Sequence, residues 1–500
     1  MFVGGNVYCK TMVFPTMEKR APTGKRGFST TATQPPIFCC AEQLMPNRPV
    51  IRSIFVHWLP LLACCTIIIY HFWYVSSYAI NVPHHDGIYD FLRFVNAAED
   101  TRSVKDGFLE WFTQYNDHRT NASRLAVYTA YLIEGEVNFH TLTLLANLAL
   151  PLILLLIYVA VRREEYRWII LLVSTFFLLN LRSFTLVLWS QAAFAYYYVF
   201  LYGFACLFVL HKVTWPKLLL AAFLCTLSTF SLGSGQLVWL LGLASLIHQW
   251  LVTKRRPPTY AAIWLAVAVI MLLVWRIDFF VAKPETIGGI PIDQIHDLHP
   301  QILFGAPLNL ILSRFATFFL VSLGSAFTTS STVVAGSIGL VLLSTLLFIT
   351  FKSYKNDDIR LVLCCWFVVA SAAAITYGRS IVVPPSYVLS SRYSFISVVL
   401  ICMLAPLVQM RFALFKRTTV TILVVLLAGS SYMWTYSHFE GRLQKLLGQR
   451  HAAFNRQHFP VYGFHISEPN EIVRQAIAAG IYKPPCRPLP QCELAPPQAE

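Results

Sequence analysis

Charged side chains are scarce in this sequence. They make up only 13% of its 500 residues, whereas hydrophobic residues make up 56%. A soluble domain carries about 25% charged residues, so the shortage excludes an ordinary soluble protein. The apolar residues gather in runs long enough for helices that cross a bilayer, each of which needs about 20 residues. The sequence therefore predicts an all-α polytopic membrane protein.

Acidic residues are rarer than basic ones. The 24 Asp and Glu residues against 39 Lys and Arg residues give a formal net charge of +15. The basic residues stand in short segments between the apolar runs, where they set the orientation of a membrane protein. Their placement argues against a nucleic-acid site.

Familiar cysteine signatures are also missing. No CxxC pair and no Cys/His spacing typical of zinc sites is present, and most of the 12 cysteines fall inside apolar runs as expected packing residues. Cys486 and Cys492, in the segment CRPLPQC, are the exception because an oxidising compartment would allow a short disulfide. The first apolar run begins near Ile54 and is too long for a signal peptide. Met45, just before it, is an alternative start of the chain.

Eleven apolar runs are expected to cross the membrane: 54–77, 140–161, 168–187, 190–211, 217–232, 235–252, 260–277, 332–351, 359–377, 393–410 and 418–435. A further run, 304–324, is interrupted by Pro307, Asn309 and Arg314. With the N-terminus inside and eleven spans, every connecting segment on the inner side is basic, as the positive-inside rule requires. The run 304–324 is therefore expected to be an interfacial or re-entrant helix at the outer surface.

This arrangement divides the chain into three parts. Residues 1–50 show no sustained period and are expected to be a disordered cytoplasmic segment. Residues 51–435 form the transmembrane domain. Residues 436–500 form an outer tail that reads as a small loop-and-helix appendage with a flexible Pro-rich end.

The outer loop 78–139 is polar for its position between two spans. Apolar residues recur at helical spacing in its segments 88–95 and 104–115, which predicts two helices lying in the interface with their apolar faces toward the lipid. Asp86 and Asp90 are four residues apart and are expected to share one helix face. They either solvate the N-terminal end of that helix, where its dipole favours negative charge, or take part in catalysis.

Several arginines are predicted on the outer side, where they oppose the orientation rule. Arginine at the centre of a membrane helix costs about 2.5–3.5 kcal/mol and usually marks a partner. Either the outer carboxylates pair with these arginines, or the guanidinium groups bind phosphate, whose geometry suits them. The phosphate explanation is favoured because the arginines converge on one side with the aromatic residues Trp189, Tyr196 and Tyr393 nearby. The polar set on this side is Asn116, His118, Arg119, Arg182, Arg379 and Arg392.

The order of these features resembles a group of bacterial multi-spanning proteins of the GT-C class of membrane glycosyltransferases. The features are HHDGIYDFL after the first span, YNDHR, FSLGSGQLVWLLGL in a later span, SRY before a late span and an outer C-terminal tail. The resemblance covers about residues 50 to 480. It implies a GT-C-like fold in the bacterial inner membrane, with the N-terminus inside and the C-terminus outside.

The resemblance also implies an enzyme that moves a sugar from a polyprenyl-phosphate carrier to an envelope glycan or lipid acceptor at the outer face. Asp86 matches the acidic residue that acts as base, and Asp90 is a second candidate. The usual acidic pair appears here as His85-Asp86, which leaves the use of a divalent cation open. The arginines would hold the carrier phosphate, while Asn116 and His118 would orient the substrate or the loop. Sugar transfer needs such a base and such cations.

Other classes of function remain open. A transporter or flippase of lipid-linked saccharides would need polar residues at mid-membrane depth and often shows inverted repeats, whereas the charges here lie at the outer edge and no repeat is visible. A polymerase of lipid-linked saccharides would use similar chemistry. A non-catalytic scaffold would use the outer charges as structural pairs. His296 and His299, three apart in QIHDLHP, are a weak metal signal, because such histidines are more often unliganded.

Overall fold

The computed structural model describes most of the chain. The described residues are 58–84, 86–101, 103–114, 118–161, 164–252, 258–277, 286–287, 290–291, 307–353, 359–381, 383–414, 418–455 and 467–485. The predictions for residues 1–50, for Asn116, for His296 and His299 and for the Cys486–Cys492 disulfide fall outside these ranges.

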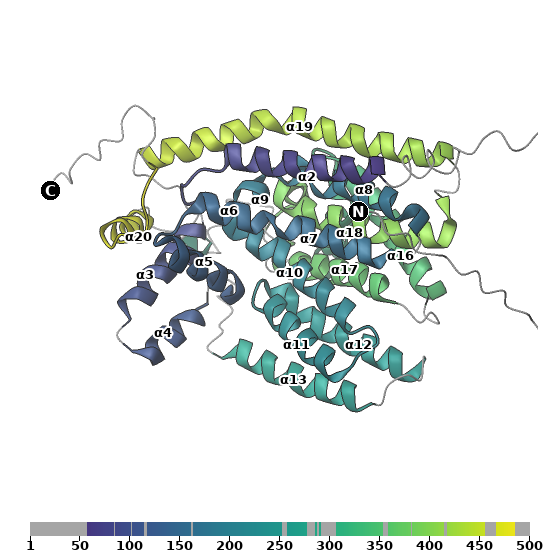
Figure 1. Cartoon of the computed structure of the whole chain (residues 1–500), viewed down its shortest axis with the longest axis horizontal. Coiled ribbons are helices and arrows are strands. Elements are labelled where there is room, and N and C mark those ends of the chain that lie inside the picture. The colour runs from purple at the N-terminus through teal and green to yellow at the C-terminus, as the bar shows by residue number, and fades with distance from the viewer. Residues whose placement is uncertain are drawn as a thin grey trace, which may run out of the picture. The chain divides into compact units, whose positions relative to one another are not determined.

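Helices account for nearly all the described secondary structure, which confirms the all-α prediction (Figure 1). The outer-loop and tail helices are η2 (Ile88–Leu92), α3 (Arg93–Asp100), α4 (Val104–Trp111), α5 (Asn121–Glu134) and α20 (Ser467–Ala478). The remaining helices in the first half are α2 (Leu59–Tyr78), α6 (Phe139–Asn147), α7 (Ala149–Ala160), α8 (Glu164–Leu178), η3 (Leu181–Ser183), α9 (Phe184–Leu188), α10 (Ser190–Val209), α11 (Trp215–Thr229), η4 (Gly233–Gln236) and α12 (Leu237–Leu251). The second half holds α13 (Thr259–Arg276), α15 (Leu308–Gly324), η5 (Ser325–Phe327), α16 (Thr332–Ser353), α17 (Arg360–Arg379), η6 (Pro385–Leu389), α18 (Ser391–Phe412) and α19 (Thr418–Asn455). Two short strands, β1 (Thr286–Ile287) and β2 (Ile290–Pro291), pair antiparallel.

Ten helical segments in the described part of the chain are long and apolar enough to cross a membrane. Their number and length indicate a multi-pass membrane protein. They are Leu59–Tyr78, Phe139–Ala160, Tyr166–Leu188, Ser190–Val209, Thr259–Arg276, Leu308–Phe327, Thr332–Ser353, Arg360–Arg379, Ser391–Phe412 and Thr419–Gly448. Two of the eleven expected spans, 217–232 and 235–252, correspond to α11 and α12, which have only 15 residues each. The last helix, α19, is much longer than its expected span 418–435.

The structure shows how the run 304–324 packs on its neighbours, and its expected interfacial or re-entrant placement stays a prediction. Its residues form α15, which pairs with α16 in a close hairpin and packs on α17 and α18. Gly324 lies against the backbone of Ala335 and Gly339, and Gly339 lies against the backbone of Leu320. The physical reason is that glycine has no Cβ, so two helix backbones can touch at these points. A sequence pattern of apolar residues does not reveal such a contact.

This hairpin makes a testable prediction. A Cβ at Gly339 would overlap the carbonyl oxygen of Leu320, so Gly339→Ala is expected to lower the free energy of unfolding by about 1–3 kcal/mol. The matched control is Gly336→Ala, one turn away, whose Cβ would meet only the Val321 side chain at 3.9 Å. The control should be neutral or slightly stabilising. Thermal unfolding of both variants in detergent measures the difference, and equal melting temperatures would contradict the close contact.

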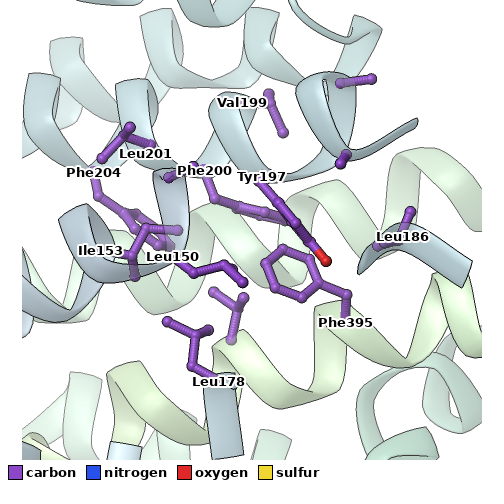
Figure 2. Close-up of a cluster of buried hydrophobic side chains, with 14 of the residues drawn as sticks. Leu150, Ile153, Leu178, Leu186, Tyr197, Val199, Phe200, Leu201, Phe204 and Phe395 are labelled. Carbon is purple, nitrogen blue, oxygen red and sulfur yellow. The ribbon is translucent and has the colours of Figure 1, made fainter. Parts of the chain in front are cut away.

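Helix α10 lies at the centre of the helical core. Its residues Tyr197, Phe200 and Phe204 pack against α17 and α18, and Figure 2 shows Tyr197 and Phe395 directed toward one another. The Tyr197 and Phe395 ring centroids are 4.6 Å apart, and those of Phe200 and Phe367 are 5.4 Å apart. These large buried rings fix the rotation of α10, and with it the direction of every other side chain on this helix.

Helix α19 lies beside α2 (Figure 1). Tyr436 on α19 packs on Tyr70 and Tyr74 of α2, and the Tyr78 hydroxyl donates a hydrogen bond to Glu440 at 3.2 Å. The expected boundary between membrane domain and tail, at residue 436, therefore falls inside a continuous helix. Aromatic packing on α2 stabilises the extension beyond the apolar run.

The tail after residue 466 is docked on the outer loop where the structure describes it. Helix α20 packs on η2 and α3, and Asn96 donates to the Ile472 carbonyl at 3.2 Å. The Tyr482 hydroxyl donates to the Asn81 carbonyl at 2.7 Å. The predicted loop-and-helix appendage is thus a brace for the segment that carries Asp90.

Candidate functional site

Asp90 is the centre of a buried polar network. Its side chain is 0% exposed and pairs with Arg124, which is 3% exposed, at 3.0 Å. Thr120 donates to the same carboxylate at 2.6 Å, and Gln191 donates to its other oxygen at 3.2 Å. A fully buried carboxylate held by three donors has the geometry of a structural ion pair. The role of Asp90 as a second base stays a prediction.

Arg124 is bound on its other side as well. Its Nη1 donates to the Thr113 carbonyl and hydroxyl, both at 2.9 Å, and its guanidinium lies 5.2 Å from the centre of the Phe94 ring. Nearby, burial and then the Glu99 carboxylate raise the pKa of Tyr128, so this phenol stays protonated and donates to Glu99 at 3.0 Å. The pair between Asp90 and Arg124 thus ties η2 to the end of α4 and the start of α5.

Two of the predicted phosphate ligands are committed to backbone carbonyls. Arg119 donates to the carbonyls of Phe112 and Ile277, which joins the outer loop to the end of α13. Arg182 donates to the carbonyls of Ser325, Thr328 and Leu389 at 2.8 to 3.2 Å. Both side chains are buried, at 3% and 2% exposure. Helix ends leave carbonyls without partners, and these arginines satisfy them in place of the expected phosphate or carboxylate.

Arg182 also fixes the position of η6, because one of its acceptors, the Leu389 carbonyl, lies in that helix. Leu389 ends η6, and the same short helix carries Tyr387. The Tyr387 hydroxyl accepts a hydrogen bond from Arg392 Nη2. Arg182 is therefore a positioning residue that holds η6 beside the start of α18.

Asp86 and Asp90 are four residues apart but lie in different surroundings. The segment continues from Asp86 into a π-helical turn, η2, which contains Asp90. Asp90 is turned into the network with Arg124, whereas Asp86 stays half-buried at the start of the segment. Gly87 follows Asp86 because a Cβ there would press on the Phe139 ring at 3.1 Å. The two carboxylates thus have different surroundings and different roles.

Asp86 lies within electrostatic range of Arg392. The Arg392 guanidinium rests over the rings of Tyr393 and Tyr387, at 4.9 and 5.4 Å from their centres. Tyr196 of α10 completes the aromatic surround, with its ring centre 6.4 Å from that of Tyr393. Stacking on aromatic rings leaves the edge of a guanidinium able to bind an anion. This group forms the candidate site.

A second cation adjoins the site. Arg379 is exposed at the end of α17 and, like Arg392, is within electrostatic range of Tyr196. Two arginines therefore lie within electrostatic range of Tyr196. The prediction that Arg379 and Arg392 flank one outer loop and converge is consistent with these contacts.

The remaining predicted residue, His118, lies at a different point. Its Nδ1 would be 3.5 Å from a Cβ placed on Gly233 in η4, the short helix between α11 and α12. The GSG segment at 233–235 is a helix interruption, as its glycines indicate. Close to the candidate site, the His84 ring contacts Trp189 edge to face, with centroids 5.2 Å apart. His84 comes two residues before Asp86, so Trp189 anchors the approach to that carboxylate.

The described residues contain no group of three or more His, Cys, Asp or Glu side chains that could hold a metal ion. Asp86 has His84 close in sequence, and His85 is outside the described ranges. The use of a divalent cation at Asp86 therefore stays a prediction from the sequence.

Several members of these networks were not singled out from the sequence. Thr120, Gln191 and Tyr387 act through contacts between distant segments, for which a single sequence contains no signal. Arg124 had a weak signal, since it follows Asn116 and Arg119 in one polar stretch. The π-helical turn that contains Asp90 had none.

Comparisons with known proteins do not identify the chain. No family model matches it, and neither a curated protein nor a solved structure does.

Proposed function

We propose that this protein is a membrane glycosyltransferase that moves a sugar from a polyprenyl-phosphate carrier to an envelope glycan or lipid acceptor. The observation that carries the proposal is that a half-buried carboxylate, Asp86, lies within electrostatic range of the ring-stacked Arg392 guanidinium. Exposed Arg379 adds a second positive charge within electrostatic range of Tyr196. An acid to accept a proton and cations to hold a phosphate are the groups that this reaction needs.

Each residue has a role in the proposed reaction. The Asp86 carboxylate takes the proton from the acceptor hydroxyl, which then forms a bond to the anomeric carbon of the sugar. The bond from that carbon to the carrier phosphate breaks, and the phosphate leaves with the electron pair. Arg392 and Arg379 stabilise the charge on the leaving phosphate. Asp90, Arg119 and Arg182 act outside this chemistry by holding the elements in place.

The helical architecture is compatible with this function. Ten long apolar helices and an outer cap of shorter helices agree with a GT-C-like fold, which we propose for this chain. With the run 304–324 as an interfacial or re-entrant helix, the basic segments between the eleven expected spans support an inner-membrane orientation with the N-terminus inside and the C-terminus outside. In that orientation Asp86, Arg379 and Arg392 lie on the outer side, where a lipid-linked sugar would be used.

The function is tested by loss of the gene. Envelope glycans and lipid-linked sugars are compared by mass spectrometry in a deletion strain with and without the wild-type gene. The expected result is a missing sugar in the deletion strain, accumulation of its lipid carrier and restoration by the gene. An unchanged glycan profile under conditions where the gene is expressed would contradict the proposal and favour transport or a scaffold role.

The phosphate site makes its own prediction. Arg392→Gln keeps a hydrogen-bonding side chain but removes the cation, so transfer is expected to fall about 10²- to 10³-fold. The matched control is Arg474→Gln, because Arg474 is 66% exposed on α20. The measurement is the restored glycan at equal protein levels, with the melting temperature of each purified variant. Full transfer by Arg392→Gln would remove Arg392 from the site.

A further inference from the structure

A groove runs between α5 and α10. It has a volume of about 310 Å³ and is lined mainly by apolar side chains. One wall is formed by Ala122, Ala126 and Ala130 of α5, which are spaced four apart and face the groove together. The opposite wall consists of aromatic side chains of α10.

The aromatic wall is a continuous row. Phe194, Tyr198 and Tyr202 follow at intervals of four residues, with neighbouring ring centroids 5.2 and 5.5 Å apart. The Tyr198 hydroxyl is satisfied by the Leu145 carbonyl at 2.7 Å. Most of what this wall presents to the groove is therefore aromatic carbon, which suits a hydrocarbon chain.

One polar atom in the groove has no partner. Ser123 lines the groove and is 2% exposed, and its hydroxyl has no hydrogen-bond partner among the residues that the structure describes. The other small hydroxyls are satisfied, since Thr129 donates to Leu125 at 2.7 Å and Ser231 donates to Leu227 at 2.7 Å. A buried hydroxyl without a partner is unfavourable. An oxygen atom of a ligand would satisfy it.

The groove opens toward apolar surroundings. Ile133, which lines it, is 79% exposed, and Leu132 and Leu125 on the same helix are 65% and 51% exposed. Such residues are stable in contact with lipid tails and unfavourable in water. A chain can therefore enter from the bilayer.

The groove and the proposed transfer site lie on different faces of α10. A residue advances about 100° around an α-helix, so Tyr196 points about 160–200° away from Phe194 and Tyr198. Tyr196 is the residue that contacts the Arg392 cluster. A carrier whose phosphate is bound by Arg392 would have to pass around α10 to place its chain in this groove. The occupant is therefore a different lipid.

We propose that the groove between α5 and α10 binds one acyl chain of a bilayer phospholipid, with the Ser123 hydroxyl donating to an ester or phosphate oxygen of that lipid. The site does not depend on the proposed transfer reaction. The bound chain fills the space between the alanine and aromatic walls and stabilises the packing of α5 on α10. Because Arg124 follows Ser123 directly, the lipid also supports the buried pair with Asp90.

The test uses the full-length protein in phospholipid nanodiscs with a phosphatidylglycerol probe that carries a diazirine on its acyl chain. After irradiation, labelled peptides are mapped by mass spectrometry. We expect labels on residues 121–134 and 190–209. Ala126→Trp or Ala130→Phe fills the groove and should lower labelling there about tenfold, while labelling of α2 peptides stays unchanged. Ser123→Ala should lower it about two- to tenfold.

The matched control is Leu125→Trp, which adds the same ring on α5 outside the groove lining and should keep the wild-type labelling. Unchanged labelling in both filled variants would overturn the site. Displacement of the probe by a polyprenyl monophosphate, in the presence of excess phospholipid, would overturn the occupant and assign the groove to the carrier chain. Melting temperatures identify any variant that has failed to fold, and the second filled variant then decides.

Discussion

Asp86→Asn is expected to abolish most of the transfer while leaving the protein folded. Asparagine has the same shape as aspartate but cannot accept the acceptor's proton, and loss of a general base costs about 10²- to 10⁴-fold in rate. Asp86 is half-buried at the start of its segment, so the substitution disturbs little packing. The measurement is restoration of the envelope glycan in a deletion strain, with protein level and melting temperature determined in parallel.

The matched control for this variant is Asp100→Asn. Asp100 is an exposed carboxylate at the end of α3, outside the candidate site, and the same chemical change there should leave transfer intact. If Asp86→Asn restored the glycan as well as wild type does, Asp86 would be structural and the proposed base would be wrong. A loss of both transfer and thermal stability would place Asp86 among the structural pairs.

Asp90→Asn is expected to have the opposite effect, a loss of stability instead of a specific loss of transfer. Asp90→Asn leaves Arg124 as a buried cation without its counterion, and breaking such a pair by removing one partner costs about 3–5 kcal/mol. The variant should therefore melt at a much lower temperature and accumulate poorly. Thermal unfolding in detergent measures the loss, and any fall in transfer should follow the fall in folded protein.

Two further variants measure how much of the lost stability comes from the ion pair between Asp90 and Arg124. Combining Asp90→Asn with Arg124→Gln removes both charges, so the double variant should lose less stability than the sum of the two single variants. Glu471→Gln breaks the exposed pair with Arg474 at 3.5 Å and should cost no more than about 1 kcal/mol. A stable Asp90→Asn variant that lacks transfer would contradict the structural role and return Asp90 to the catalytic candidates.

The spacing of Asp86 and Asp90 in the sequence does not show which of the two carboxylates is buried. A spacing of four placed Asp86 and Asp90 on one face of an ideal α-helix, and both remained candidates for the base. Thr120, Arg124 and Gln191 enclose Asp90, whereas Asp86 is only half-buried. The contacts come from residues up to 101 positions away in the sequence, so no local pattern could have distinguished the two carboxylates.

The sequence also shows that the arginines need partners but does not show which groups these are. An arginine at the edge of a membrane span needs a partner, and that inference from the sequence was correct for Arg119 and Arg182. The expected partners were carboxylates or phosphate, whereas the observed ones are carbonyls at the ends of helices. Every helix end has such carbonyls, but which end meets which arginine depends on how the helices pack.

The long apolar runs decide that this chain is helical and belongs in a membrane, because a bilayer leaves a backbone of that length no other way to satisfy its hydrogen bonds. The same runs locate most of the long helices, and helical periodicity in 88–95 and 104–115 locates η2, α3 and α4 of the outer loop. Tertiary packing decides the rest. It joins α15 to α16 through glycine contacts, docks α20 on the outer loop and separates a fully buried Asp90 from a half-buried Asp86. Periodicity reports which residues prefer lipid or protein to water, whereas the identity of each partner depends on contacts between segments far apart in the sequence.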